Sequence, residues 1–277
     1  MVNVMHIALY AGEGLQADDL LTFAKPFITT LARQLTLIAP TEEQSTLDEI
    51  LTRLQLDPTI TVRRWCQEES FTLAILKAVQ TVHPDVLLLP AFTARATPLE
   101  WWLRREEFNL LRMLPVSFLR VHGRITPIRQ ILLASAGGEQ SIRCVPLVSQ
   151  IARAFQATVT VLHVVSQEVV YFEGFAASPL SGETALQIDE ATATVLHRMV
   201  AALATEGVSC RLQVINGLVE ETLLTECQHY DLFVIGSHLA DDVAPTSQWL
   251  RFLRRISLQD VTRDLLEGSP IPVLVVR

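Results

Sequence analysis

A buried strand that ends at a glycine, a serine and a histidine stands near the end of the chain, in DLFVIGSH (231–238). Glycine lets backbone N–H groups approach a phosphate closely, and a serine hydroxyl can donate to a phosphate oxygen. A helix that begins after such a turn adds positive potential. These residue types indicate the start of a phosphate-binding loop, with Gly236, Ser237 and His238 as candidate ligand-binding residues.

A glycine-rich turn, AGGEQS (136–141), follows an earlier strand. It resembles the SGGxDS loop of ATP pyrophosphatases, but Ala136 and Gln140 replace the serine and the aspartate on which that loop depends. We therefore interpret the segment as a turn into a helix over 141–155, with Ser141 close to its N-cap.

Other catalytic and metal-binding patterns do not emerge from the spacing of reactive residues. The cysteines at 66, 144, 210 and 227 lack CxxC spacing, and the seven histidines form no HxxxH or HExxH pattern. We interpret the cysteines as free thiols in a reducing compartment. Ser237 and His238 are neighbours at a strand end, where their side chains point apart. The sequence therefore predicts no catalytic residue and no metal site.

Composition limits the class of protein further. The chain has 277 residues, of which 49% are hydrophobic and 19% charged, and this suits two domains with sizeable cores. The net charge of −8 argues against a nucleic-acid partner. No apolar run approaches the roughly 18 residues of a membrane-spanning helix. The first residues, MVNVMHIALYAGEG, lack a basic leader, so we expect a cytoplasmic location without a membrane span.

Strands and helices alternate along the chain, and the alternation then repeats. The expected strands are 6–11, 34–40, 59–65, 85–91, 115–121, 130–135, 158–165, 210–216, 231–237 and 272–277. The expected helices are about 16–33, 43–56, 69–82, 141–155, 183–206 and 219–229, with a Trp-rich helical stretch before 115. Strands that are apolar on both faces and separated by helices predict an α/β fold with a parallel sheet covered on both sides.

The two passes also match in detail. HPDVLLLPAF (83–92) aligns with HYDLFVIGSH (229–238), and PVSFLR (115–120) aligns with PVLVVR (272–277). WLRR (102–105) follows the strand at 85–91, and WLRF (249–252) follows the strand at 231–237 after nearly the same number of residues. A duplication is the simplest account. It predicts two domains, residues 1–123 and 124–277.

The second pass resembles the universal stress protein family in QILLASAGGEQS, ATVTVLHVV, VINGLVEETLL, DLFVIGS and SPIPVLVVR. The first pass is similar in layout but more diverged, so the chain looks like a tandem universal stress protein. The resemblance implies two repeated five-stranded, mainly parallel sheets of the HUP or Rossmann-like type, with helices on both faces. It also implies an internal pseudo-dimer in which the last strands, 115–121 and 272–277, are the pairing edges.

ATP-binding members of the family carry an aspartate after the first strand and a motif of the form G-x-x-G, about nine residues, then G-[S/T]. Here Ala136 replaces the aspartate, Leu239 replaces the second glycine, and Gln259-Asp260 replaces the final pair, with Thr262 nearby. A carboxylate about 4 Å from a phosphate charge repels it by roughly 4 kcal/mol at an effective dielectric constant near 20. In the first pass, Pro90-Ala91 stands where Gly-Ser is expected.

The resemblance implies a non-enzymatic stress-response protein that acts through a small-molecule ligand or a protein partner, without a bound cofactor. One alternative is an ATP- or AMP-binding protein, with Mg²⁺ and slow hydrolysis, that uses only the second domain. Another is a purely structural interaction module. The candidate ligand-binding residues are Gly137, Gly138, Val164, Gly236, Ser237, His238, Asp260 and Thr262. The apolar insert 166–182 is either a lid over a small ligand or an element of a further homodimer.

Overall fold

A computed structural model describes residues 5–11, 17–40, 44–67, 71–90, 109–166, 189–236 and 263–277. The first half contains β1 (Met5–Tyr10), α1 (Ala17–Leu31), β2 (Ala32–Pro40), α2 (Gln44–Leu54), β3 (Thr61–Gln67), α3 (Phe71–Val82), β4 (Val86–Pro90) and β5 (Ser117–Val121). The second half contains β6 (Gln130–Ser135), the 3₁₀ helix η2 (Glu139–Cys144), α5 (Val145–Phe155), β7 (Thr158–Ser166), α6 (Glu190–Thr205), β8 (Cys210–Gly217), α7 (Val219–Cys227), β9 (Leu232–Gly236) and β10 (Val273–Val276). Helical residues 109–113 and 263–268 precede β5 and β10.

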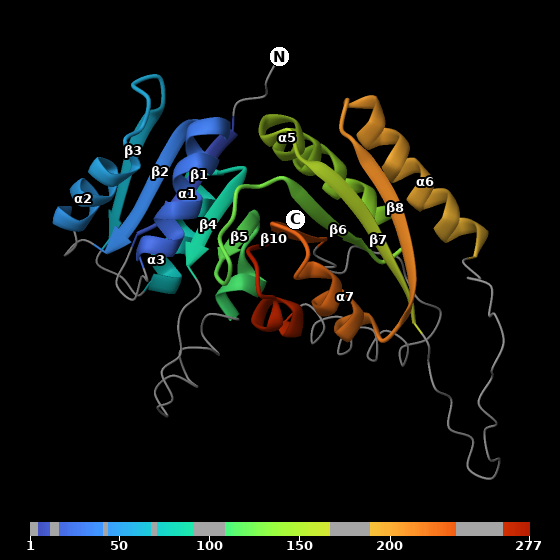
Figure 1. Cartoon of the computed structure of the whole chain (residues 1–277). Helices are drawn as coiled ribbons and strands as arrows, with labels where there is room; N and C mark the ends of the chain where they lie inside the picture. The colour runs from blue at the N-terminus through green and yellow to red at the C-terminus, as the bar shows by residue number, and fades with distance from the viewer. Residues whose placement is uncertain are drawn as a thin grey trace, which may run out of the picture.

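The strands form one continuous ten-stranded sheet in the order β3-β2-β1-β4-β5-β10-β9-β6-β7-β8 (Figure 1). Each half therefore repeats the same order around its own first strand. All neighbouring strands are parallel except β5 and β10, which are antiparallel and join the halves. The α/β class, the repeated five-stranded arrangement and the pairing edges expected from the sequence are confirmed.

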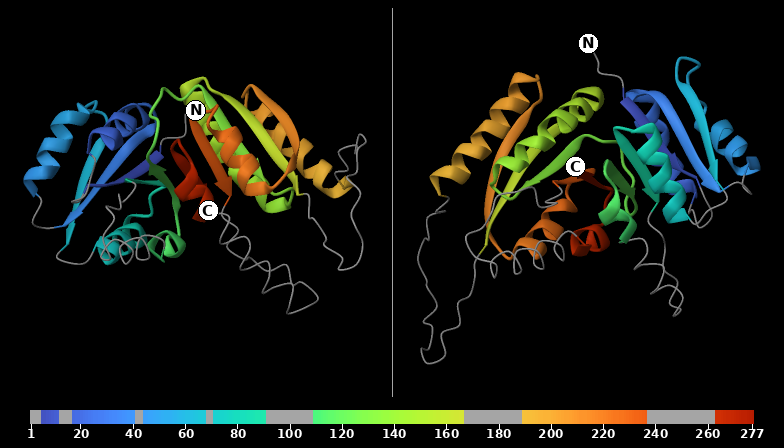
Figure 2. Two further views of the ribbon diagram at one scale, coloured as in Figure 1. Left: turned by 60° about the horizontal axis from the view of Figure 1, so that its bottom comes forward. Right: turned by 180° about the vertical axis from the view of Figure 1, so that it is seen from behind.

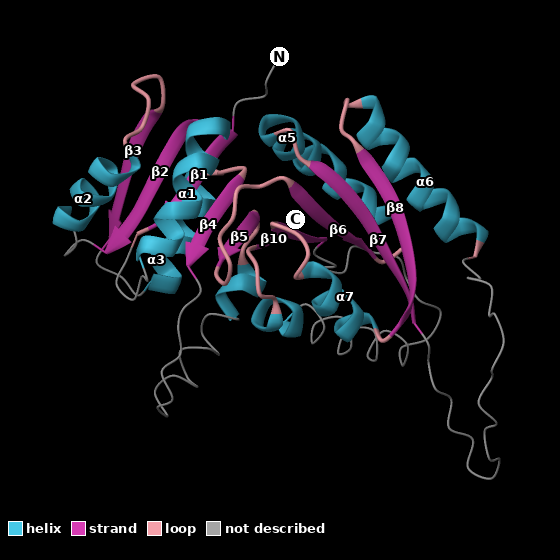
Figure 3. Ribbon diagram, viewed as in Figure 1, coloured by secondary structure: helices cyan, strands magenta, loops and turns pink. Residues whose placement is uncertain are grey.

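Helices cover both faces of the sheet (Figures 2 and 3). On one face α1, α2, α5 and α6 contribute to a single buried cluster that runs through both halves. On the other face α3, α7 and the helical residues 109–113 and 263–268 contribute to a second cluster. Because both faces are covered, the central strands are apolar along their whole length, as the sequence pattern indicated.

Two arginines cross the junction between the halves in opposite directions. Arg120 at the end of β5 donates to the Leu266 carbonyl at 2.7 Å, and Arg277 after β10 donates to the Leu111 carbonyl at 2.7 Å. On the other face of the sheet, Phe27 of α1 stacks on Phe155 of α5, with ring centroids 6.1 Å apart. The junction is therefore packed on both faces of the sheet, and burial lowers the pKa of Arg277.

The helix expected over 141–155 begins later, so the prediction of Ser141 as a residue near its N-cap is wrong. The chain first makes η2, and α5 starts at Val145 with Pro146 in its first turn. Proline suits the start of an α-helix because its φ is preset and its missing N–H has no partner there. Ser141 lies buried inside η2, where its N–H donates to the Gly138 carbonyl at 2.9 Å.

Some of the remaining sequence predictions are confirmed, and others concern residues outside the described part of the chain. All four cysteines are free, as expected. The Trp-rich stretch after β4 and most of the 166–182 insert lie outside the described residues, and the domain boundary at 123/124 stays a prediction. Among the described helices, none has the length and apolar character that crossing a membrane requires.

Candidate ligand-binding site

The carboxyl ends of β6, β7 and β9 meet at one edge of the second half, where open α/β sheets bind their ligands. Gly137 and Gly138 follow β6, Val164 lies near the end of β7, and Gly236 ends β9. The structure therefore brings these four predicted residues to the same edge. The other four, Ser237, His238, Asp260 and Thr262, lie outside the described residues.

Gly137 packs against the protein itself. Its φ of +80° favours glycine, and a Cβ there would lie 2.6 Å from the Thr192 methyl carbon and 3.2 Å from His163 Cε1. Thr192 belongs to the first turn of α6, and His163 belongs to β7. A larger residue at position 137 would therefore clash with Thr192, so the turn requires glycine for its packing as well as for its backbone conformation.

Ser135 and His163 hold the turn after β6 in place. The Gly137 N–H donates to Ser135 Oγ at 3.1 Å, and His163 Nδ1 lies 2.9 Å from the Ser135 carbonyl oxygen. A carbonyl only accepts, so Nδ1 carries the hydrogen in this contact, and Nε2 of the neutral ring is an acceptor. Sequence reasoning missed His163, although the parallel register places it directly beside Ser135 on the neighbouring strand.

The first turn of α6 is capped by Asp189, the residue directly before the helix. Asp189 accepts hydrogen bonds from the Thr192 N–H and the Thr192 hydroxyl, both at 2.8 Å. These hydrogen bonds lower the pKa of the Asp189 carboxyl. The cap satisfies one N–H of the helix terminus and places a carboxylate beside it, so this terminus is a poor place for a further anion.

The segment after Gly138 also carries an internal ion pair. Glu139 opens η2 and pairs with Arg198 of α6, and the side chains of Glu139 and Arg198 are 67% and 54% exposed. Ala136, at the position where the family resemblance placed an aspartate, is exposed. Among the described residues of this turn, the nearest carboxylate to Ala136 in the sequence is Glu139, and it is paired with Arg198.

Gly236 and Val164 differ in how accessible they are to a ligand. Gly236 is partly exposed, and a Cβ there would lie 3.2 Å from Cys144 Sγ, which is tight. Burial raises the pKa of the Cys144 thiol to about 12, so this sulfur is a packing group and not a nucleophile. Val164 is only 8% exposed and belongs to the buried cluster under α7.

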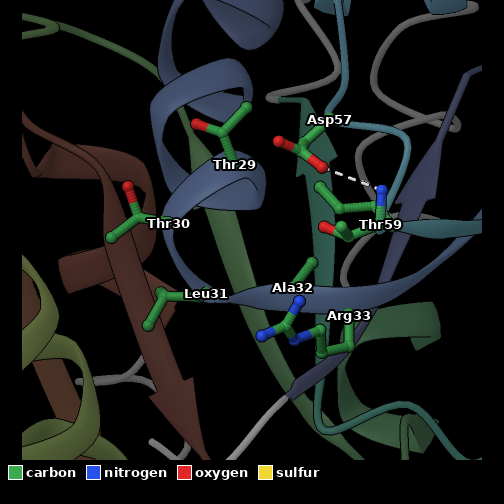
Figure 4. A pocket seen from close by; sticks show the side chains of 8 residues that line it. Thr29, Thr30, Leu31, Ala32, Arg33, Asp57 and Thr59 are labelled. Carbon is green, nitrogen blue, oxygen red and sulfur yellow. Dashed lines mark hydrogen bonds between the residues drawn. The ribbon is translucent and has the colours of Figure 1, made fainter.

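A small polar hollow lies in the first half of the protein, at the amino ends of strands β2 and β3 (Figure 4). Its volume is about 190 Å³, and it is lined by Thr29, Thr30, Leu31, Ala32, Arg33, Asp57, Thr59 and Ile60. The Asp57 carboxylate accepts from the Thr59 N–H at 2.8 Å. The hollow is smaller than most ligand sites and lies at the amino ends of the strands, away from the predicted crevice.

Residues 127–277, which span the whole second half of the sheet, match the model of the universal stress protein family. The chain belongs to the universal stress protein family. A comparison with curated proteins found no significant match.

Solved structures of the same fold extend over nearly the whole chain of this universal stress protein. One is a universal stress protein from Archaeoglobus fulgidus DSM 4304, with a TM-score of 0.65, 12% identity and coverage of 98% of this chain and 96% of that one. A Pseudomonas aeruginosa UCBPP-PA14 protein described as a universal stress protein has a TM-score of 0.65, 16% identity and coverage of 99% and 93%.

A third structure is the cytoplasmic domain of a prokaryotic cation chloride cotransporter, with a TM-score of 0.59, 11% identity and coverage of 98% and 95%. At these identities, the likeness to all three structures shows the fold alone.

Proposed function

We propose that this universal stress protein is a non-enzymatic stress-response protein that acts in the cytoplasm through a small-molecule ligand or a protein partner and does not bind ATP. The observation that carries the proposal is the packing of Thr192 and His163 against Gly137. This packing places two side chains of the protein next to the predicted ligand-binding residue Gly137. The four free cysteines support a reducing compartment.

Two further residues support the loss of nucleotide binding. Ala136 replaces the aspartate that ATP-binding members carry after the first strand, and the Glu139 carboxylate, close to the two glycines, is already paired with Arg198. The likeness to a transporter domain illustrates that this fold does not by itself imply catalysis.

A thermal-shift titration with ATP and AMP, each with and without Mg²⁺, tests the proposal directly. We expect no change in Tm, because a ligand stabilises only a protein that binds it. Native mass spectrometry of the purified protein should show the chain mass without a nucleotide adduct. A saturable rise in Tm with ATP, or an ATP or AMP adduct, would overturn the proposal.

Nucleotide binding by the second half alone is a second candidate, favoured by the partly exposed Gly236 at the carboxyl end of β9. In the sequence, Asp260 stands where the family motif has a serine or threonine. If this candidate holds, Asp260→Ser should strengthen ATP binding in the same titration, because it removes a charge that repels phosphate. Wild-type protein and Asp260→Ser that both fail to respond would reject it.

We also propose that the first half is a second, diverged domain of the family. A repeated side-chain row supports this: Thr36 of β2 lies beside Arg63 of β3, and Thr160 of β7 lies beside Arg211 of β8. Both threonines are buried, with exposures of 0% and 1%. A buried polar residue at the same place in both halves is unusual enough to support common ancestry. A crystal structure whose halves did not superpose in this row would contradict it.

A further inference from the structure

The polar hollow at the amino ends of β2 and β3 is bordered by one positive and one negative side chain. Arg33 belongs to β2, and Asp57 lies in the loop before β3. In Figure 4, Asp57 lies in the upper part of the view and Arg33 in the lower part. Both side chains are exposed, and among the described residues neither forms an ion pair. Two opposite charges that line one hollow without pairing are complementary to a ligand that carries both charges.

The Asp57 carboxylate is held in its ionised form. It accepts a hydrogen bond from the Thr59 N–H at 2.8 Å. This bond, a second one from the Thr59 hydroxyl and then the Arg33 charge lower the pKa of Asp57. The loop that carries Asp57 is also tied to α1, because Lys25 Nζ donates to Gln55 Oε1 at 2.7 Å. The acidic side of the hollow is therefore charged and held against α1.

The end of α1 adds acceptors for a cationic group. Residues 29–31 are the last of this helix, and they line the hollow. The last carbonyls of an α-helix have no partner within the helix and carry the negative end of its dipole. The last turn of α1 contains no basic residue that would compensate this potential. The Thr29 hydroxyl donates to the Lys25 carbonyl at 2.8 Å, so its oxygen can still accept.

The second half has an internal ion pair at the corresponding place. α1 and α5 each end five residues before the buried threonine of the repeated row, so Thr29 corresponds to Arg153. Arg153 pairs at 3.0 Å with Glu206, which lies in the loop before β8 as Asp57 lies in the loop before β3. In the first half, threonine replaces this arginine, and the charges of Arg33 and Asp57 stay apart.

The size and the remaining lining of the hollow limit the ligand further. Its volume of about 190 Å³ corresponds to about six water molecules at about 30 Å³ each. A nucleotide is too large for this space, whereas glycine, alanine and serine fit. Leu31, Ala32 and Ile60 are buried and provide a small apolar surface beside the polar groups.

We propose that this hollow binds a small free α-amino acid. A guanidinium binds a carboxylate through two parallel hydrogen bonds, so Arg33 receives the carboxylate of the ligand. Asp57 and the end of α1 receive its ammonium group. The hollow lies at the amino ends of the strands, so this site is separate from the crevice at the carboxyl ends and does not depend on whether ATP binds there.

Isothermal titration calorimetry of the full chain with glycine, L-alanine and L-serine tests the proposal. We expect saturable binding of these amino acids. Propionate and ethylamine are the matched controls, because each lacks one of the two charged groups of L-alanine. Both should bind at least about tenfold more weakly than L-alanine, since each loses hydrogen bonds to a charged group. Absence of binding by all three amino acids, or propionate that binds as tightly as L-alanine, would overturn the proposal.

Four variants determine whether this binding takes place in the hollow. Arg33→Gln and Asp57→Asn each remove one charge and keep a hydrogen-bonding group, and each should weaken L-alanine binding at least about tenfold. Thr29→Arg introduces the residue that α5 has at the corresponding place and should abolish binding by filling the hollow. Arg153→Thr, the reciprocal change in the second half, should bind like the wild type.

Circular dichroism of each variant checks that it is folded. Binding that persists in folded Thr29→Arg would overturn the proposal. Binding that is unchanged in both Arg33→Gln and Asp57→Asn, or that is lost in folded Arg153→Thr, would do the same.

Discussion

Asp85 and Asp231 make the same pair of hydrogen bonds in the two halves of the protein. The His6 N–H donates to the Asp85 carboxylate at 2.8 Å, and the Asp85 N–H donates to the His6 carbonyl at 2.8 Å. The Gln130 N–H donates to the Asp231 carboxylate at 2.9 Å, and the Asp231 N–H donates to the Gln130 carbonyl at 2.9 Å. Each aspartate therefore ties its strand to the first strand of its half.

The two aspartates should differ in their contribution to stability. Asp231 also accepts from the Arg129 N–H at 2.9 Å and from the Thr126 hydroxyl at 2.6 Å, so it holds the connection between the halves. We expect Asp231→Ala to lower the free energy of unfolding by about 2–3 kcal/mol and Asp85→Ala by about 1 kcal/mol. Urea denaturation followed by circular dichroism measures both. Equal losses would show that the additional bonds contribute little.

Gly137→Ala should destabilise the protein through contact with Thr192. Gly207 provides a matched control, because its φ of +75° is similar to the +80° of Gly137, but a Cβ there meets nothing within 4 Å. Gly207→Ala should cost about 1 kcal/mol for the backbone conformation alone. Gly137→Ala should cost at least about 1 kcal/mol more, since added atoms in a packed site force displacement.

The double variant Gly137→Ala with Thr192→Ser separates the two causes, because serine lacks the methyl group that the new Cβ would meet. We expect it to recover part of the stability that Gly137→Ala loses, in the same urea denaturation series. If Gly137→Ala and Gly207→Ala cost the same, or if the serine gives no recovery, Thr192 does not pack against residue 137 as the structure indicates.

His122 should make stability depend on pH. Burial, and then the nearby Arg120 charge, lower the pKa of His122 from 6.5 to about 4, and its buried Nε2 has no hydrogen-bond partner among the described residues. The unfolded chain therefore binds a proton that the folded chain excludes between these values. The free energy of unfolding therefore keeps its full value above pH 6.5. It falls as the pH drops towards 4, by up to about 3 kcal/mol.

Denaturant titrations of wild-type protein and His122→Gln at several pH values between 4 and 7 isolate this contribution. The variant cannot take up the proton, so its free energy of unfolding should fall less over this range. Parallel pH profiles for the two proteins would show that His122 is not the group responsible.

The cysteines should react with a thiol reagent in two groups. Cys144 and Cys227 are buried, whereas Cys66 and Cys210 are partly exposed; burial raises the pKa of the Cys144, Cys227 and Cys210 thiols. Because the thiolate is the reactive form, Cys144 and Cys227 should stay unlabelled at pH 8 until denaturant is added. Mass spectrometry of labelled peptides assigns the sites. Rapid labelling of Cys144 in the folded protein would contradict its burial beside Gly236.

The resemblance to the universal stress protein family implied the two pairing edges, and the sequence alone predicted the order of strands and helices and the repeat. These follow from local patterns: apolar strands buried on both faces, and landmarks such as His83-Pro84-Asp85 that recur as His229-Tyr230-Asp231. It also predicted which glycines reach the carboxyl edge of the second half, because parallel strands end together. The predicted start of α5 is too early, because the chain makes the 3₁₀ helix η2 after the glycine turn and α5 begins only at Val145, beside Pro146.

Only the tertiary structure decided what those residues contact. Gly137 packs against Thr192, which is 55 positions further along the chain, and His163 contacts Ser135 because the two residues are level on neighbouring strands. Asp231, a repeat landmark in the sequence, proved to bind the amino end of β6, away from the crevice. Contacts of this kind depend on the spatial approach of distant segments. No local spacing records that approach, so the same glycines could have lined an open site or a filled one.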